Sequence, residues 1–273
     1  MKFQEELTSY LIISVTMNSH NRNLERTVDG FVARDKLSII ALNCNSIYSN
    51  ERRDSLNDFI LEHKPDIFLL SETKLDQNCN CEFENYTTVR NDRPTTQGRN
   101  SGGTATLIKQ QYTHTHINIP KITDFKHLGT TIILIKIPRN KNLYIISAYV
   151  STTDSAEFTV EINSIFHTLH LHRPNNYYIL AGDLNARHRN WLNSVNNSRG
   201  ITTNSWLENN YTLFRCKLYH TSIPTFHRDT NSYIDLAIAD GRIKFNRFPT
   251  PKSNNDQFGL LGLQQVVIMM LSK

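Results

Sequence analysis

The stretch YYILAGDLNARHRNW, residues 177–191, joins an apolar run directly to a polar and basic segment. Residues 177–183 are mostly aromatic or aliphatic, which predicts a buried β-strand. Asp183 and Asn185 come at the end of this run. A bare carboxylate is costly inside a strand but less costly at its end, where water or a metal ion can satisfy it. The stretch therefore predicts a strand that delivers polar side chains to the rim of a sheet.

Three other apolar runs end in the same way. LSIIALN ends on Asn43, DIFLLSE ends on Glu72, and NLYIISAYV carries Tyr149 as its last residue but one. Taken alone, each of these residues is more simply explained as a turn or capping residue. Four strands that all end on polar residues favour a shared site, because mixed αβ sheets usually build their sites at strand ends.

The order of the predicted elements indicates the fold class. Leu56, Phe59 and Ile60 lie at helical spacing between the first two strands, and Pro65 ends that helix. A strand, helix, strand order normally places both strands in one sheet. Further strands are predicted at 102–109, 130–137 and 232–240, and further helices at 155–172 and 202–210. The pattern predicts an α/β fold with two packed sheets and outer helices.

The chain has the composition of an ordinary globular protein. It has 273 residues, 38% of them hydrophobic and 20% charged, which allows a sizeable core. We assign residues 36–250 to the folded domain, 1–35 to an N-terminal extension without a sharp pattern, and 251–273 to a divergent or truncated tail. The net charge of +5 is compatible with a polyanionic partner and equally with simple solubility.

The cysteines and the apolar runs bear on the compartment. Four cysteines fit neither a disulfide framework nor a zinc site, so we expect reduced thiols in an intracellular protein. The apolar run near the start is too short for a membrane span, and the N-terminus lacks the basic segment of a signal peptide. We therefore expect no membrane association and no secretion.

The polar residues at the strand ends suit one kind of chemistry. Carboxylates without a histidine or cysteine cluster favour Mg²⁺ or Mn²⁺ over zinc. Asn and Tyr side chains can donate to phosphate oxygens as charge builds in a transition state. A second carboxylate can orient or deprotonate a water molecule. Together they describe phosphodiester hydrolysis without a covalent intermediate.

In its motifs the sequence resembles the endonuclease/exonuclease/phosphatase superfamily, and within it the endonuclease domain of non-LTR retrotransposons. The resemblance spans about residues 37–257 and is carried by LNCNS, LLSETKL, SGGTATLIK, SAYV, GDLNARHRNW, PTFH and SYIDLAI, in that order. GDLNARHRNW and the two late motifs are more similar to arthropod-type elements than to the DNA-repair branch. The resemblance implies a four-layer αββα sandwich that acts on DNA.

The resemblance also implies roles for the residues of the early motifs. Glu72 would hold the metal, Mg²⁺ or Mn²⁺, with Asn43 and Asn45 beside it. Asn45 stands where some relatives carry an acidic metal ligand. Tyr149 would donate to the phosphate.

The later motifs would complete the site. By resemblance, Asp183 orients the attacking water and Asn185 contacts the phosphate. Thr225 and Ser232 belong to the late motifs near the scissile group and are expected to contact DNA. Asp235 would orient a catalytic histidine that follows in a Ser-Asp-His motif.

That histidine is missing from the sequence. No histidine follows Asp235, and the nearest match to the motif, SNNDQFGL, carries Gln257 at the histidine position. Glutamine can donate a hydrogen bond but has no positive charge and no titratable proton near neutral pH. We therefore expect an activity that is weakened or lost.

The segment RHR, comprising Arg187, His188 and Arg189, follows the predicted site directly. It could contact a DNA backbone or be a solvated loop, and the sequence favours neither. Relatives of this type continue into a reverse transcriptase, so we expect that this chain was originally fused to one. No other obligate protein partner is indicated.

Three hypotheses follow. The first is a Mg²⁺-dependent DNA endonuclease of retrotransposon origin, nuclear if it acts on genomic DNA. The second is a catalytically inactive relic that at most binds nucleic acid. The third is a phosphoesterase of the same superfamily that acts on a small substrate.

Overall fold

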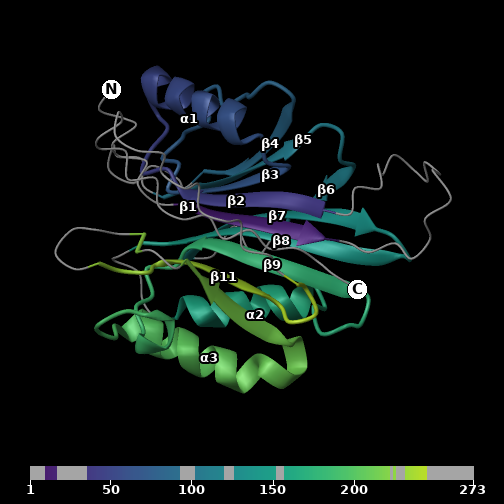
Figure 1. The fold of residues 1–273 in the computed structure, drawn as a ribbon, viewed down its shortest axis with the longest axis vertical. Coiled ribbons are helices and arrows are strands. Elements are labelled where there is room, and N and C mark those ends of the chain that lie inside the picture. Colours follow the sequence, from purple (N-terminus) through teal and green to yellow (C-terminus); the bar gives the residue numbers. More distant parts are fainter. Residues whose placement is uncertain are drawn as a thin grey trace, which may run out of the picture.

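Two β-sheets pack face to face, and helices cover both outer faces (Figure 1). The computed structural model describes residues 10–16, 36–92, 102–119, 126–151, 157–221, 224–225 and 231–244. Helix α1 covers one sheet, and helices α2 and α3 cover the other. The predicted αββα sandwich is confirmed. Gln257, the predicted C-terminal tail and most of the predicted N-terminal extension lie outside the described residues.

The first sheet contains five strands, in the order β1 (Tyr10–Thr16), β2 (Lys36–Asn43), β3 (Ile67–Ser71), β5 (Thr104–Lys109) and β4 (Tyr86–Asn91). As predicted, β2 and β3 lie in one sheet, and they are parallel. Helix α1 (Asn50–His63) connects them, and it ends where Lys64 adopts a left-handed conformation before Pro65. The other pairs in this sheet are antiparallel.

The second sheet contains six strands, in the order β10 (Cys216–His220), β11 (Asp235–Asp240), β9 (Asn176–Asp183), β8 (Lys141–Val150), β7 (Leu128–Ile137) and β6 (His114–His116). Here β8 and β9 are parallel and are connected through α2 (Phe158–Thr168). The remaining pairs are antiparallel. Among the described residues, no helix combines the length and the hydropathy that a membrane span requires.

The layer between the sheets changes from apolar to polar along the strands. Ile67 and Leu69 of β3 and Ala181 of β9 belong to the apolar core between the sheets. Because side chains on one face of a strand recur every second residue, the next residues on these faces are Ser71 and Asp183. The same alternation that builds the core therefore delivers polar side chains to one end of it.

Polar contacts join the two sheets at this end. The Ser147 hydroxyl on β8 donates to the Leu70 carbonyl on β3 over 3.0 Å. The hydroxyls of Thr104 on β5 and Thr131 on β7 lie 2.8 Å apart. These bonds offset part of the cost of burying hydroxyl groups between two sheets.

Two helices differ in length from their predictions. Helix α2 was predicted over 155–172 but ends at Thr168, because His170 is left-handed and the Leu171 amide turns back to donate to the Phe166 carbonyl. Helix α3 was predicted over 202–210 but spans Ser198–Phe214. Four strands were not predicted, and they are the outermost strands of the two sheets: β1, β4, β6 and β10.

The loop between β9 and α3 is tied together by Asn197. Its side-chain oxygen accepts from the backbone amides of Arg187 and Gly200, at 2.9 and 2.7 Å. Its side-chain nitrogen donates to the Asn185 carbonyl over 2.8 Å. A Cβ atom at Gly200 would lie 1.8 Å from the Arg187 carbonyl oxygen, so α3 packs on this loop without room for a side chain.

We expect Gly200→Ala to destabilise the protein. Glycine to alanine in a helix ordinarily stabilises by about 0.5–1 kcal/mol, but overpacking against the Arg187 carbonyl should instead cost about 1–3 kcal/mol of the free energy of unfolding. Urea unfolding measures the change. The neighbouring Ile201→Ala, at an exposed position, should change the free energy by less than about 0.5 kcal/mol. A Gly200→Ala variant as stable as the parent would show that the loop can move away.

Candidate active site

A hydrogen bond between the ends of two strands connects the two sheets at the candidate site. Asn43 is the last residue of β2 in the first sheet, and Asp183 is the last residue of β9 in the second. The Asn43 side-chain nitrogen donates to Oδ2 of Asp183 over 2.7 Å. Two residues that are 140 positions apart in the sequence thus meet across the layer between the sheets.

Three neighbouring strands of the second sheet place side chains next to Asp183. Tyr149 on β8 and Asp235 on β11 both stand in register with Asp183. Asp183 and Asp235 are each 2% exposed, and Tyr149 is buried as well. The predicted Tyr149, Asp183 and Asp235 set is therefore brought together, with two carboxylates side by side in a buried setting.

This setting perturbs the protonation of Asp183. Burial raises the pKa of Asp183 well above its ordinary value, and the neighbouring Asp235 carboxylate raises it further. Hydrogen bonds from the Asn185 amide and the Asn43 side chain act in the opposite direction, and Glu72 contributes a smaller upward effect. A proton or a cation beside these carboxylates would relieve their repulsion.

The backbone is strained where the strands end. Asn45, Glu72, Lys74 and Asn185 all have positive φ, at 39°, 57°, 53° and 47°. Left-handed conformations are tolerated by asparagine but are costly for glutamate and lysine. Three of the four are candidate site residues from the sequence, and such strain is often concentrated at functional sites.

Glu72 and Asn45 converge on a single cation. Lys74 Nζ lies 3.0 Å from Oε1 of Glu72 and 3.0 Å from Oδ1 of Asn45. Both oxygens therefore already share one positive charge, and one carboxylate with one amide oxygen suits an ion such as Mg²⁺ that keeps waters and phosphate oxygens as its other ligands. Within the part of the chain that the structure describes, no three His, Cys, Asp or Glu side chains gather closely enough to hold a metal ion.

Asn185 donates hydrogen bonds from both its backbone amide and its side chain. Its amide donates to Oδ1 of Asp183 over 2.8 Å, and its side-chain nitrogen donates to the Val150 carbonyl over 2.8 Å. Asn185 therefore orients Asp183 directly. The second N–H of the same nitrogen could make the predicted contact with a phosphate, which stays a prediction.

Thr225 and Ser232 hold the start of β11. The Thr225 amide donates to the Ser232 carbonyl over 2.8 Å. The Thr225 hydroxyl accepts from the backbone amides of Ile234 and Asp235, each at 3.3 Å. Both residues are buried. These contacts position Asp235, and the role of Thr225 and Ser232 in DNA binding stays a prediction.

The basic segment lies in the loop that Asn197 ties to Asn185. Arg189 is exposed, whereas Arg187 and His188 are half-buried. The His188 ring lies 5.0 Å from the ring of Trp191, centroid to centroid, and its Nδ1 accepts from the Asn190 amide. The loop is thus held rigidly beside the site, and its contact with DNA stays a prediction.

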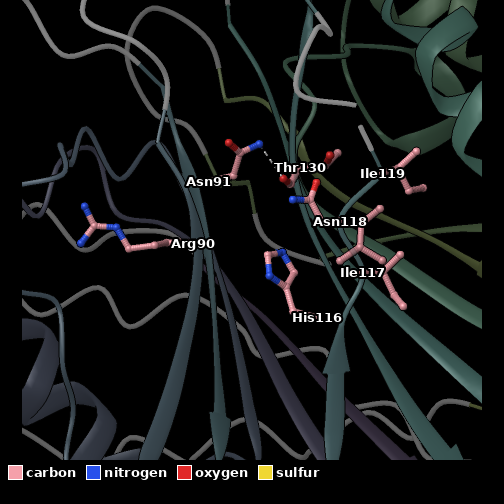
Figure 2. Close-up of a pocket in the computed structure, with 8 residues that line it drawn as sticks. Arg90, Asn91, His116, Ile117, Asn118, Ile119 and Thr130 are labelled. Atoms are coloured by element: carbon pink, nitrogen blue, oxygen red, sulfur yellow. Dashed lines mark hydrogen bonds between the residues drawn. The ribbon is translucent and has the colours of Figure 1, made fainter. Parts of the chain in front are cut away.

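A small hollow of about 120 Å³ is lined by residues of β4, of β7, and of β6 with the segment that follows it (Figure 2). Asn91 on β4 bridges to β7 here, donating from its side chain to the Thr130 carbonyl over 3.0 Å. Thr130 stands in register with Ala148, next to Tyr149. None of the candidate catalytic residues lines the hollow, which is walled by isoleucines and edged by His116 and Asn118.

Sequence reasoning missed Lys74 and Asn197. Lys74 belongs to the LLSETKL motif, two residues after Glu72. Its position in that motif was the available signal, but a lysine beside a carboxylate is ordinarily a surface ion pair. Asn197 was not recognisable, because its partners Arg187 and Asn185 are contacted only after the loop folds back.

Comparisons with known proteins identify a matching family and similar folds. The sequence profile of the endonuclease/exonuclease/phosphatase family matches residues 40–253. No curated protein sequence matches significantly. The fold is similar to the endonuclease domain of TRAS1, a telomere-specific non-LTR retrotransposon, with 17% identity, a TM-score of 0.55, and coverage of 74% of this chain and 83% of that one.

Two further solved structures are similar in fold. The human Nocturnin catalytic domain has 12% identity and a TM-score of 0.50, covering 84% of this chain and 90% of that one. A mannosyl-6-phosphatase from Bacteroides thetaiotaomicron has 13% identity and a TM-score of 0.50, covering 75% and 85%.

The electrostatics of Asp183 predict a pH-dependent effect of Asp183→Asn. In the folded chain the pKa of Asp183 is raised, so its contribution to stability is present at low pH and is lost as the pH rises and the buried carboxyl ionises. Asparagine does not ionise. The measurement compares the melting temperatures of the variant and the parent with EDTA present. The difference, variant minus parent, should increase between about pH 4 and pH 8. Each kcal/mol of repulsion removed should add roughly 2–4 °C.

The companion variant Asp235→Asn removes the neighbouring charge and should make the melting temperature of the chain less dependent on pH over the same range. A melting difference between Asp183→Asn and the parent that is constant, or that shrinks as the pH rises, would contradict this description of the site.

Proposed function

The chain belongs to the endonuclease/exonuclease/phosphatase family, and from this premise we propose that it is a divalent-metal-dependent DNA endonuclease of the non-LTR retrotransposon type. The observation that carries the proposal is the bond of 2.7 Å between Asn43 and Asp183. This bond joins β2 of one sheet to β9 of the other, at the ends of the strands that carry the family's motifs. It therefore supports one polar site with residues from both sheets. The likeness in fold to the TRAS1 endonuclease domain supports the retrotransposon type.

In the proposed reaction, Asp183 takes a proton from the attacking water. Burial and Asp235 raise the pKa of Asp183, which moves this carboxyl towards the range where a group can accept a proton near neutral pH. The Asn185 amide and the Asn43 side chain each bond one of its oxygens, at 2.8 and 2.7 Å. Both oxygens are therefore held in fixed directions before substrate arrives.

Glu72 and Asn45 would hold the divalent ion. Their oxygens share one cationic neighbour, so they already converge in a manner that suits an oxygen-liganded ion. When bound, such an ion neutralises charge on the phosphate and on the leaving oxygen. The hydroxyl of Tyr149, in register with Asp183, would donate to a non-bridging phosphate oxygen.

The segment after the site supplies the positive charge for a DNA backbone. Residues 184–207 include Arg187, Arg189 and Arg199 and contain no Asp or Glu. A strip of this kind beside the catalytic carboxylates would guide a polyanion to them, through contacts that weaken with salt and are insensitive to base sequence.

A second candidate function is DNA binding without cleavage. The observation that favours it is Gln257, at the position where the family motif has its histidine. A third candidate, a phosphoesterase for a small substrate, is favoured by the similarity in fold to the mannosyl-6-phosphatase. The absence of acidic residues from 184–207 argues for the larger polyanion.

We expect the chain to nick supercoiled plasmid in Mg²⁺ and to stop when EDTA is added. Glu72→Ala should lower the nicking rate at least about 10²–10³-fold, because it removes the one carboxylate at the metal position, and Tyr149→Phe should lower it about 10²-fold by removing one phosphate donor. Equal rates for the parent and Glu72→Ala would point to a contaminating nuclease.

Gln257→His separates the candidates. If the histidine restores a group that stabilises transition-state charge, the nicking rate should rise by about 10² or more. Plasmid binding without nicking by either chain would favour the second candidate. Hydrolysis of a small phosphoester with no nicking would favour the third.

A further inference from the structure

Lys74 lies where the divalent ion of the proposed site would bind. Its Nζ atom is 3.0 Å from Oε1 of Glu72 and 3.0 Å from Oδ1 of Asn45. We infer that the ammonium group of Lys74 is a built-in cation, which holds the metal-binding oxygens together when no ion is bound and which must move aside for a divalent ion to bind. The inference rests on the proposed metal site and concerns how that site is filled.

The backbone around Lys74 fixes it in this place. Its amide donates to the Gly102 carbonyl over 2.7 Å, and the Thr73 amide donates to the Gly103 carbonyl over 3.2 Å. Gly103 packs against Thr73 so closely that a Cβ atom there would lie 2.5 Å from the threonine hydroxyl. The chain thus holds Lys74 in its left-handed conformation and on the same side as Glu72.

Neighbouring segments hold the backbone of the two residues whose side-chain oxygens Lys74 contacts. The Ser46 amide donates to the Glu72 carbonyl over 2.8 Å, and the Asn45 amide donates to the Asn43 side chain over 2.9 Å. The Asn43 side chain in turn bonds Asp183. Lys74 therefore contacts side chains whose residues are themselves held by backbone and side-chain hydrogen bonds, unlike a solvated surface lysine.

The charges around the site explain why a cation is needed there. Glu72, Asp183 and Asp235 are close enough for both other carboxylates to raise the pKa of Asp183. One ammonium group reduces this repulsion in the metal-free chain. A divalent ion at the same oxygens would be repelled strongly by the ammonium at contact distance, so Lys74 lowers the affinity of the site for metal alone.

Asn45 makes this competition stronger. An acidic residue at position 45 would provide a second carboxylate beside Glu72, so that one could bind the metal and the other the lysine. With a neutral amide at Asn45, the metal and the ammonium group of Lys74 would compete for the Glu72 carboxylate. Binding of metal is then favoured most when a phosphate group adds negative charge.

A second lysine in the chain provides a matched control. Lys109 Nζ lies 3.2 Å from Oδ1 of Asp66, and its side chain is 22% exposed, against 29% for Lys74. Both lysines thus form partly buried ion pairs of similar length. Lys109 is at the opposite end of the first sheet, because Asp66 precedes β3 whereas Glu72 follows it.

The test titrates MgCl₂ and MnCl₂ into the purified chain without DNA, by isothermal calorimetry. Lys74→Met keeps the length of the side chain and removes its charge, and it should bind either ion about tenfold more tightly than the parent, by removal of the repulsive charge. Lys109→Met should bind the ions as the parent does. Lys74→Arg keeps the charge and should bind them no more tightly than the parent.

A second measurement uses the unaltered chain, so that it does not depend on how a variant folds. Lysines are acylated briefly with and without MgCl₂, and the modified residues are quantified by mass spectrometry. Acylation of Lys74 should increase several-fold with Mg²⁺, because the ion displaces the ammonium group into solvent. Acylation of Lys109 should not change.

The outcomes distinguish this inference from the proposed function. Equal or weaker metal binding by Lys74→Met, or a Lys74 whose acylation does not respond to Mg²⁺, would overturn the inference while leaving plasmid nicking to be judged separately. No metal binding by the parent or by Lys74→Met would overturn the inference, and nicking that persists in EDTA would then overturn the metal-dependent function as well.

Discussion

The hydrogen bond from Asn43 to Asp183 is the contact on which the candidate site depends. It joins the last residues of two central strands, one from each sheet, over 2.7 Å. Other contacts between the sheets at this end, such as those of Ser147 with Leu70 and of Asn91 with Thr130, do not involve Asp183. With it, the residues of the first sheet that we propose to bind the metal and those of the second that we propose to contact the phosphate are connected.

This arrangement has a cost in stability that a purely structural core would avoid. Asp183 and Asp235 are buried next to one another, and like charges in a buried setting oppose folding. The hydroxyls of Ser71, Thr73 and Thr106 are buried without a hydrogen-bond partner in the described structure. Apolar side chains would pack the sheets better here, so the polar end of the layer is best understood as a requirement of function.

The sequence predicted the parts of the site that local patterns determine. Asn43, Glu72, Tyr149 and Asp183 were identified because each lies at the end of an apolar run. For Asn43, Tyr149 and Asp183, the period-2 alternation of the strand places the residue on the face that the core between the sheets uses. Glu72 lies one residue beyond β3. The shared sheet of β2 and β3 and the two packed sheets followed from the same runs.

The parts that the sequence did not predict depend on contacts between distant segments. The outer strands β4, β6 and β10 have weak patterns because only part of each is buried or half-buried. The role of Lys74 depends on the left-handed turn after β3, which is held by Gly102 and Gly103 from another strand connection. Helix α3 begins earlier than predicted because Asn197 caps it while also binding Arg187, and no local pattern in the sequence reports such a shared contact.

The candidate site depends most directly on the coupling between Asn43 and Asp183, which a double-mutant cycle measures. The free energy of unfolding is determined by urea for the parent, Asn43→Ala, Asp183→Ala and the double variant. A hydrogen bond to a charged group should give a coupling energy of about 1.5–3 kcal/mol, with the double variant less destabilised than the sum of the single ones. Effects that add within about 0.3–0.5 kcal/mol would mean that the two residues do not hold the sheets together, and the site would then need a different structural basis.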